Sequence, residues 1–381
     1  MDLGYSDDQR LLKESIERVL ADGYDVPRRA AYAAEPRGFS ESLWRTYAEL
    51  GVLGIPFAET EGGLGGGPVE IMIVMEALGR AMAVDPYLPS VVLGGGVLRH
   101  AGNDEQRRRY TASIIDGSQT LAVATTEPES GYDIAHVATR ARRDGAGWVL
   151  DGAKSVVLGG GGASQVVVPA RVSGAVRDPA GIGLFLIDAS TAGLERRRYK
   201  MQDGLDGADL RLAGVRCGAD AVLGDPEGGF PVLATVVDEG RAALCAEAVG
   251  AMDRLFTLTL EYLKTRQQFG QPLGHFQALQ HRAVDLFVAL EQARSMALFA
   301  TLSLSNSDPT ERARGVMAAK VQVGTAARRL GQEAVQMHGA MGMTVDYACG
   351  VLFKRLTMID CTLGHARELS RSLAELGGLP C

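Results

Sequence analysis

The chain has 381 residues, of which 46% are hydrophobic and 22% are charged, and its formal net charge is −7 at pH 7. This length exceeds that of a typical single domain, so two or three structural units are expected. The acidic balance and the lack of long basic runs argue against a nucleic-acid partner. The five cysteines are odd in number and form no C-x-x-C pair, so they indicate neither a disulfide framework nor a metal site. A reducing cytoplasm is the expected location.

Residues 1–118 are expected to form an N-terminal all-α domain. Ser6 and Gln9 have the spacing of a capping box at the start of an amphipathic helix. One face of that helix carries Leu12, Ile16, Val19 and Leu20. This opening differs from an apolar signal core, and no stretch reaches about 18 uninterrupted apolar residues. The sequence therefore predicts no membrane insertion.

Residues 119–225 are expected to form a middle β-domain. Short runs rich in β-branched residues occur at 120–125, 148–150, 155–158, 165–170 and 183–188. No helical pattern separates them, which favours an antiparallel barrel or sandwich over a Rossmann fold. The glycine run 159–162 lies between two of these segments and is expected to form a long hairpin turn.

Residues 226–381 return to helical periodicity and are expected to form a C-terminal helical bundle. Two amphipathic helices are interrupted at 269–272, where Gly270 can close one helix and Pro272 cannot continue it. An arginine, glutamines and a phenylalanine surround this break, so it offers a phosphate-binding fork, amide groups and an aromatic plate. An ordinary helical hairpin with a solvated face explains the same residues equally well.

The segments TEP at 126–128 with Asp133, TRQQFGQPLGHFQALQ at 265–280 and AVQMHGAMG at 334–342 occur in this order, and together they resemble the acyl-CoA dehydrogenase family. The segment TRQQFGQPLGHFQALQ at 265–280 is similar to the family's flavin-phosphate clamp. The segment TEP at 126–128, followed by Asp133, resembles the family loop T-E-P-G-A-G-S-D, and AVQMHGAMG at 334–342 resembles the segment that receives the adenosine-phosphate end of FAD. The resemblance covers essentially the whole chain. It implies an α+β fold with an N-terminal helical domain, a middle β-barrel or sandwich and a C-terminal four-helix bundle.

The same resemblance implies a FAD site that spans a subunit interface. Thr126 would bond the flavin ring. The residues that would reach the FAD held mainly by a neighbouring chain are Arg266, Phe269 and Gln277, completed by Gln336 and Gly339. An oligomer is therefore expected.

The implied activity is α,β-desaturation of an acyl-CoA thioester, with electrons passed to an electron-transfer flavoprotein. Segments at 243–252, 277–283, 290–300 and 353–360 look most like the small subunit of pimeloyl-CoA dehydrogenase and its relatives. Such subunits are thought to work beside a larger homologous subunit. Both a homo-oligomer and a hetero-oligomer are open.

The chain departs from the family where the catalytic base is expected. The family's usual base is a glutamate that precedes a glycine late in the chain, and an ungapped alignment from Gly342 to Gly364 places Leu363 at that position. Some members carry the glutamate directly before an active-site arginine instead. That arginine corresponds to Arg241 here, and the residue before it is Gly240. Loss of a general base typically costs about 10² to 10⁴ in rate.

Three nearby carboxylates are candidates for the base. Asp360 ranks first because it lies one helical turn before Leu363, and Glu239 and Glu247 are the alternatives. Each also has a structural explanation: Asp360 as a cap or as a partner of Lys354 or Arg355, Glu239 in solvent, and Glu247 bonded to a buried group.

The flavin loops depart as well. Val156 and Leu158 replace the family's Trp-x-Thr, and Glu129 and Tyr132 replace a glycine and a serine. Two hypotheses follow: an FAD-dependent acyl-CoA dehydrogenase, or a catalytically silent subunit that completes the FAD site of a larger partner.

Overall fold

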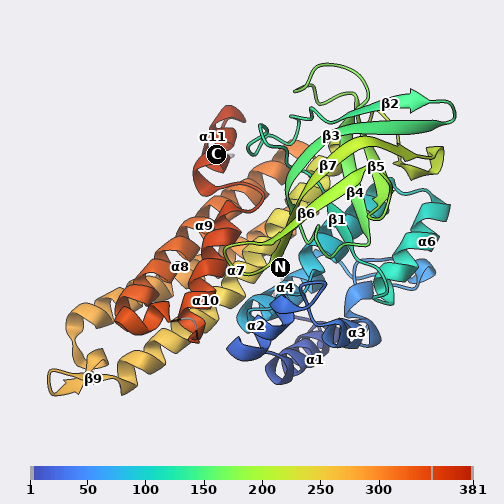
Figure 1. Ribbon diagram of the computed structural model, residues 1–381. Coiled ribbons are helices and arrows are strands. Elements are labelled where there is room, and N and C mark those ends of the chain that lie inside the picture. The colour runs from blue at the N-terminus through green and yellow to red at the C-terminus, as the bar shows by residue number, and fades with distance from the viewer. Residues whose placement is uncertain (1–3, 345, 379–381) are drawn as a thin grey trace. The chain divides into compact units, whose positions relative to one another are not determined.

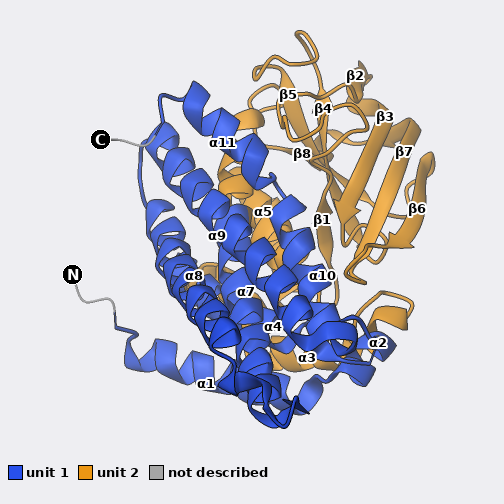
Figure 2. Ribbon diagram, turned by 90° about the vertical axis from the view of Figure 1, so that its left-hand side faces the viewer, with its two compact units in different colours: residues 1–31, 68–83, 241–381 blue, residues 32–67, 84–240 orange. Residues whose placement is uncertain are grey.

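The computed structural model describes residues 4–344 and 346–378, which form two compact units. Unit 1 comprises residues 1–31, 68–83 and 241–381, and unit 2 comprises residues 32–67 and 84–240 (Figure 2). Each unit gathers segments that are far apart in the sequence. Unit 1 in particular combines helices from the two ends of the chain.

Unit 1 is a helical assembly in which helix α9 packs against α8, α10 and α11 (Figure 1). In the same unit α1 packs against α4, and α4 packs against α8. The helices are α1 (Asp7–Gly23), α4 (Pro68–Ala81), α8 (Gln277–Ser303), α9 (Pro309–His338), α10 (Ala348–Cys361) and α11 (Ala366–Glu375), while α2 (Val26–Ala34) and α7 (Phe230–Thr265) contribute residues to both units. The described helices include none that is long and apolar enough to cross a membrane.

The predicted start of the first helix is confirmed. The Ser6 hydroxyl accepts the Gln9 N–H at 3.2 Å, and the Gln9 side chain accepts the Ser6 N–H at 3.0 Å. Ile16 and Leu20 of the predicted apolar face are buried. Local capping chemistry and periodicity therefore fix this helix.

Unit 2 contains an eight-stranded sheet with the strand order β6-β7-β3-β2-β4-β5-β8, and β1 pairs with β4. The pairings are antiparallel, except for β1 with β4 and β2 with β4. The strands are β1 (Leu121–Val123), β2 (Arg140–Asp144), β3 (Gly147–Leu158), β4 (Gln165–Arg171), β5 (Ile182–Asp188), β6 (Leu194–Lys200), β7 (Asp206–Cys217) and β8 (Val222–Leu223). The helical segments of this unit are α3 (Glu41–Glu49), the π-helix η3 (Tyr87–Gly94), α5 (Gly95–Ala101) and α6 (Asp104–Ile115), with short 3-10 turns at Val52–Gly54, Glu59–Glu61 and Ala219–Ala221.

The expectation of a hairpin at the glycine run 159–162 is wrong. Strand β3 pairs with β2 and β7, whereas β4 pairs with β1, β2 and β5, so the two strands that flank the run are not bonded to each other. The runs 148–150 and 155–158 are also one strand, β3, whose register shifts at two irregularities. Strands β2 and β6 carry mostly charged, exposed residues, which hid them from a search for apolar runs.

Helices α4 and α7 approach each other backbone to backbone at two glycines. A Cβ atom on Gly79 would lie 2.0 Å from the Glu247 carbonyl oxygen, and one on Gly250 would lie 1.9 Å from the Glu76 carbonyl oxygen. No side chain fits at such distances. The two glycines therefore set the separation of these helices within unit 1.

We predict that Gly79→Ala lowers the free energy of unfolding by about 3 kcal/mol, because the added methyl group must push α4 away from α7. The control is Gly331→Ala on α9, where the nearest atom to the added Cβ lies 3.1 Å away in the Phe353 side chain. The higher helix propensity of alanine, worth about 1 kcal/mol, offsets that contact. Urea unfolding of both variants measures the difference, and equal losses would contradict the prediction.

Candidate functional site

The predicted break after α7 is a two-stranded hairpin. Strands β9 (Gln267–Gln268) and β10 (Gln271–Pro272) pair antiparallel, and the 3-10 turn Leu273–His275 leads into α8. Phe269 and Gly270 at the tip have φ values of 54° and 79°. Two successive positive φ values define a type I′ turn, in which a phenylalanine at the first position is strained.

The hairpin presents a cation and an aromatic ring to solvent. Phe269 is 89% exposed, and Arg266 and Gln277 are also exposed. Among the described residues the Arg266 guanidinium has no ion-pair or hydrogen-bond partner, so it is available to an anionic ligand. The Phe269 ring lies edge-on to Phe276, with centroids 6.0 Å apart, and this one contact leaves most of the ring exposed in a strained turn.

A second group of predicted residues lies at the end of α9. Gln336 is exposed, and Gly339 has a φ of 61° and no atom within 4 Å of the position that a Cβ would occupy. The Tyr262 and His338 rings, which lie near the ends of α7 and α9, are 4.5 Å apart. The structure thus brings Arg266 and Phe269, on one arm, to the same end of unit 1 as Gln336 and Gly339, on the other. We call these four residues with Gln277 the clamp residues.

Thr126 lies in unit 2, at the start of a loop that is tied to β3. Its carbonyl oxygen accepts the Ser155 N–H at 2.9 Å. The buried Glu127 carboxylate accepts a hydrogen bond from the Lys154 ammonium at 2.7 Å. It also accepts hydrogen bonds from the N–H groups of Ala138 and Thr139 at the other end of the loop. Burial raises the pKa of Glu127, but attraction to Lys154 and these hydrogen bonds outweigh it, so the pKa is lowered overall. Glu127 therefore closes the loop as a carboxylate.

The strand that carries Val156 and Leu158 has an irregular backbone. Val156 has a φ of 51°, an outlier for a β-branched residue, and its N–H donates to the Asp209 carboxylate at 3.2 Å. Leu158 is half-buried. Neither side chain carries a hydrogen-bonding group where the family has a tryptophan and a threonine.

Leu363, which the sequence predicts at the usual position of the base, lies on the loop between α10 and α11. Leu363 has a φ of 55°, and its carbonyl oxygen accepts the Arg241 Nε–H at 2.8 Å. Arg241 directly follows Gly240, the alternative position of the base. Arg241 thus holds the backbone of Leu363, and neither Leu363 nor Gly240, the two positions that the sequence comparison offered for the base, bears a carboxylate.

A lysine that the sequence analysis missed holds the same loop. Lys320 of α9 is 0% exposed, and its ammonium donates to the carbonyl oxygens of Ile359 at 2.7 Å, Asp360 at 3.2 Å and Gly364 at 3.3 Å. It thereby satisfies carbonyl groups at the end of α10. The available signal was its spacing, because Lys320 falls among Val316, Val323 and Ala327 on the apolar face of α9.

Asp360 lies beneath the same loop and is engaged on several sides. Its side chain is 1% exposed, forms an ion pair with Arg328, lies 3.2 Å from His365 Nε2 and accepts the Ala366 N–H at 3.3 Å. The partner is therefore Arg328 rather than Lys354 or Arg355. These contacts connect α9, α10 and the start of α11.

The two alternative carboxylates are also engaged. Glu247 and Arg355 are both buried and form a bidentate pair, with both N–O distances 2.6 Å. In unit 2, Glu239 accepts Arg99 at 2.7 Å and lies 2.8 Å from His100. Burial raises the pKa of Glu239, but His100 and Arg99 outweigh it and lower the pKa overall. Glu239 is thus a paired carboxylate and not a solvated one.

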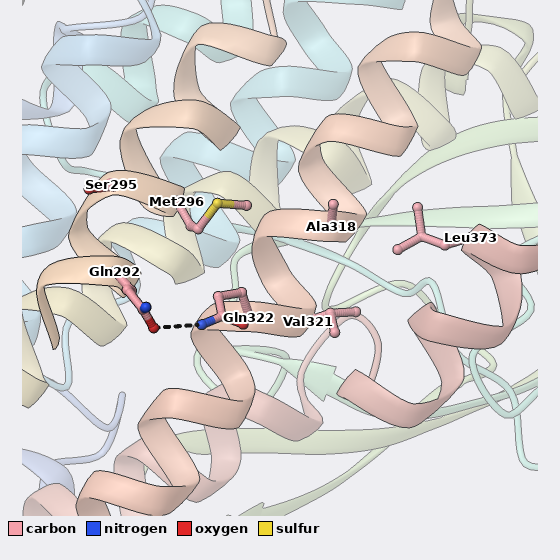
Figure 3. A pocket seen from close by; sticks show the side chains of 7 residues that line it. All are labelled: Gln292, Ser295, Met296, Ala318, Val321, Gln322 and Leu373. Atoms are coloured by element: carbon pink, nitrogen blue, oxygen red, sulfur yellow. Dashed lines mark hydrogen bonds between the residues drawn. The ribbon is translucent and has the colours of Figure 1, made fainter. Parts of the chain in front are cut away.

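A cavity of about 520 Å³ opens on unit 1 between α8, α9 and α11 (Figure 3). Its lining has no charged side chain and consists of Gln292, Ser295, Met296, Ala318, Val321, Gln322 and Leu373. Gln322 donates to Gln292 at 3.4 Å. This cavity contains none of the predicted site residues and offers no cation for a phosphate.

Comparison with known proteins identifies the family. Models of the N-terminal, middle and C-terminal domains of acyl-CoA dehydrogenase match residues 6–118, 122–214 and 227–366. The chain is 30% identical over 350 residues to the mitochondrial long-chain specific acyl-CoA dehydrogenase of Sus scrofa, and the match covers 90% of this chain and 80% of that protein. The chain belongs to the acyl-CoA dehydrogenase family. Membership confirms the predicted fold class and assigns the chain to the flavoprotein oxidoreductases that act on acyl-CoA.

Two solved acyl-CoA dehydrogenase-like structures align over nearly the whole chain. A variant of the Tcur3481-Tcur3483 steroid ACAD is 29% identical, with a TM-score of 0.88 and 97% coverage of both chains. The ChsE4-ChsE5 complex from Mycobacterium tuberculosis is 25% identical, with a TM-score of 0.89 and full coverage of both chains. The fold of this chain is thus that of the family from end to end.

We predict a pH-dependent contribution of Lys320 to stability. Burial lowers the pKa of Lys320 from 10.5 to about 8, although Cys245 and Asp360 oppose this shift. Between these two values the unfolded state binds more protons than the folded state, so the lysine's contribution to stability increases as the pH rises from 8 to 10.5. The free energy of unfolding of the wild type minus that of Lys320→Met should increase across this window in urea titrations. A constant difference would contradict the prediction.

Proposed function

We propose that this chain is a subunit of a FAD-dependent acyl-CoA dehydrogenase, in which it completes the FAD site of a larger homologous chain. The assembly desaturates the α,β bond of an acyl-CoA thioester and passes the electrons to an electron-transfer flavoprotein. In this assembly the chain supplies the clamp residues, and the partner supplies the base that removes the α-proton.

The observation that carries this proposal is the lack of an available base among the candidate positions of this chain. Leucine occupies the position of the family's glutamate, and a leucine side chain cannot accept a proton. Asp360, Glu239 and Glu247 are each paired with at least one arginine. A general base must be free to reach the proton that it abstracts, whereas these carboxylates are held by charged partners.

The clamp residues suit the phosphate end of FAD by their chemistry. Arg266 offers a guanidinium for the pyrophosphate, Gln277 and Gln336 offer amides, and Phe269 offers an exposed ring. The backbone at Gly339 is open to a close approach. Bound FAD supplies the acceptor for the hydride that leaves the β-carbon.

The flavin-ring side of this chain is less well equipped than the phosphate side. Thr126 retains its hydroxyl, but Leu158 has no donor where the family bonds the ring. A chain that binds only the phosphates of FAD held by a partner needs the clamp residues. It does not need contacts to the isoalloxazine ring of a second FAD. This asymmetry supports the role of a completing subunit.

Two further observations support a hetero-oligomer. The segments at 243–252, 277–283, 290–300 and 353–360 resemble the small subunit of pimeloyl-CoA dehydrogenase. The name of the ChsE4-ChsE5 complex joins two differently named chains, and the chain aligns with that structure over its full length.

The alternative is that the chain carries out the desaturation itself with Asp360 as the base and Arg241 lining the active site. It is favoured by the position of Asp360, whose carboxylate accepts the Ala366 N–H just beyond the loop of Leu363. To act as a base, this carboxylate would have to leave Arg328 and His365.

We predict that Arg266→Ala weakens FAD binding by about tenfold or more in the assembly of this chain with a homologous partner, because a charged hydrogen bond to phosphate is lost. The control is Arg367→Ala, which removes an exposed arginine from α11. Fluorescence titration of FAD into the flavin-free assembly measures both constants. Equal affinities in the two variants would count against the clamp.

We predict that Asp360→Asn lowers thermal stability but leaves turnover within about threefold of wild type, since proton abstraction occurs elsewhere. A loss of about a hundredfold or more in turnover of folded protein would instead identify Asp360 as the base. Bleaching of the visible flavin spectrum by acyl-CoA should require the partner chain. Bleaching by the isolated chain would overturn the completing-subunit role.

A further inference from the structure

A buried histidine connects the two arms of the clamp. His338 is the last residue of α9 and is 2% exposed. Its ring centroid lies 4.5 Å from that of Tyr262 on α7 and 5.3 Å from that of Tyr347, which precedes α10. Its Nδ1 atom lies 2.8 Å from the Ala334 carbonyl oxygen, one turn earlier in α9. The imidazole therefore fills the junction of three helix ends.

Tyr262, one neighbour of this ring, leads directly to a clamp residue, and His338 itself adjoins the other arm in the sequence. The Tyr262 carbonyl oxygen accepts the Arg266 N–H at 2.8 Å, so the tyrosine and the arginine occupy adjacent turns. His338 lies between Gln336 and Gly339 in the sequence. The separation of the Tyr262 and His338 rings thus sets the separation of the two arms.

The turn after α9 is fixed against the same histidine. A Cβ on Gly342 would lie 3.0 Å from Val335 Cα and 3.1 Å from His338 Cβ, so the 3-10 segment Gly339–Met343 folds closely onto the last turn of α9. A movement of His338 would therefore displace Gly339 as well.

We propose that His338 is a positioning residue that holds the two arms of the clamp at the spacing required by the adenosine-diphosphate part of FAD. This inference rests on the proposed function. His338 does not touch the cofactor itself; it acts through Tyr262 on the Arg266 arm and through the backbone on the Gly339 arm.

Imidazole provides two interactions at this position that an aliphatic side chain lacks, while its Nε2 atom is buried without a hydrogen-bond partner among the described residues. A flat ring can stack on Tyr262, and Nδ1–H can donate to the Ala334 carbonyl group. Burial lowers the pKa of His338, although the carbonyl groups of Ala334 and Leu258 oppose this, so the ring is neutral at neutral pH. A leucine would fill the space but would provide neither the stack nor the hydrogen bond.

The test compares FAD with FMN, which lacks the adenylate group, on the flavin-free assembly of this chain with its partner. His338→Leu should weaken FAD binding about tenfold and leave FMN binding unchanged, because only FAD spans the two arms. His338→Asn, which retains a donor for the Ala334 carbonyl group, should recover part of the loss. Tyr262→Leu removes the other ring of the Tyr262–His338 pair, so it should also weaken FAD binding and leave FMN binding unchanged. This variant keeps the inference testable if His338→Leu does not fold.

The control separates positioning from a general loss of stability. Leu330→Ala removes a fully buried side chain two turns earlier in α9, and should lower the unfolding midpoint without changing the ratio of FAD to FMN affinity. Wild-type ratios in both His338→Leu and Tyr262→Leu would overturn the inference. If Arg266→Ala still weakened FAD binding in that case, the proposed function would stand alone; unchanged FAD binding in Arg266→Ala would remove the proposed function too.

Discussion

A charged group buried inside a helical bundle must be paired with an opposite charge or with hydrogen-bonding groups. This requirement determines which interactions the carboxylates of unit 1 make. Arg355 holds Glu247, and Arg328 holds Asp360. Lys320 instead bonds carbonyl groups around the Leu363 loop. The interior is thus stabilised by interactions that bind helices together. A carboxylate paired in this way would have to leave its arginine before it could accept a proton.

Strain marks a different set of positions. Among the described residues other than glycine, Met82, Val156, Phe269 and Leu363 have positive φ values, which bulky residues adopt only when the surroundings enforce them. Val156, Phe269 and Leu363 occur in segments for which the sequence predicts contacts to the flavin ring, contacts to the phosphates and the base, whereas Met82 does not. At Val156 and Leu363 the side chain differs from the one that the resemblance leads us to expect. Only Phe269 still matches the motif.

Sequence reasoning succeeded where a short stretch of chain determines its own structure. The Ser6 capping box, the break around Gly270 and the overall order of helical and β regions follow from local chemistry.

Sequence reasoning failed where residues that are distant in the sequence determine the structure. The charged strand Leu194–Lys200 is held by pairing with β7, and the partner of Asp360 lies 32 residues away on another helix. A lysine is usually exposed, so the sequence gives little indication that the helices of unit 1 bury Lys320. A sequence motif can name candidates for a base, but only the contacts show which of them are already engaged.

Helix α9 carries Lys320, which donates hydrogen bonds to carbonyl groups around the Leu363 loop, and His338, its last residue, which lies beside the clamp residues. These residues are separated by 18 positions, or about 27 Å along a helix. One rigid element thus supports two regions that lie far apart along it. A substitution that changes the contacts of Lys320 therefore acts about five helical turns away from the segment that ends at His338.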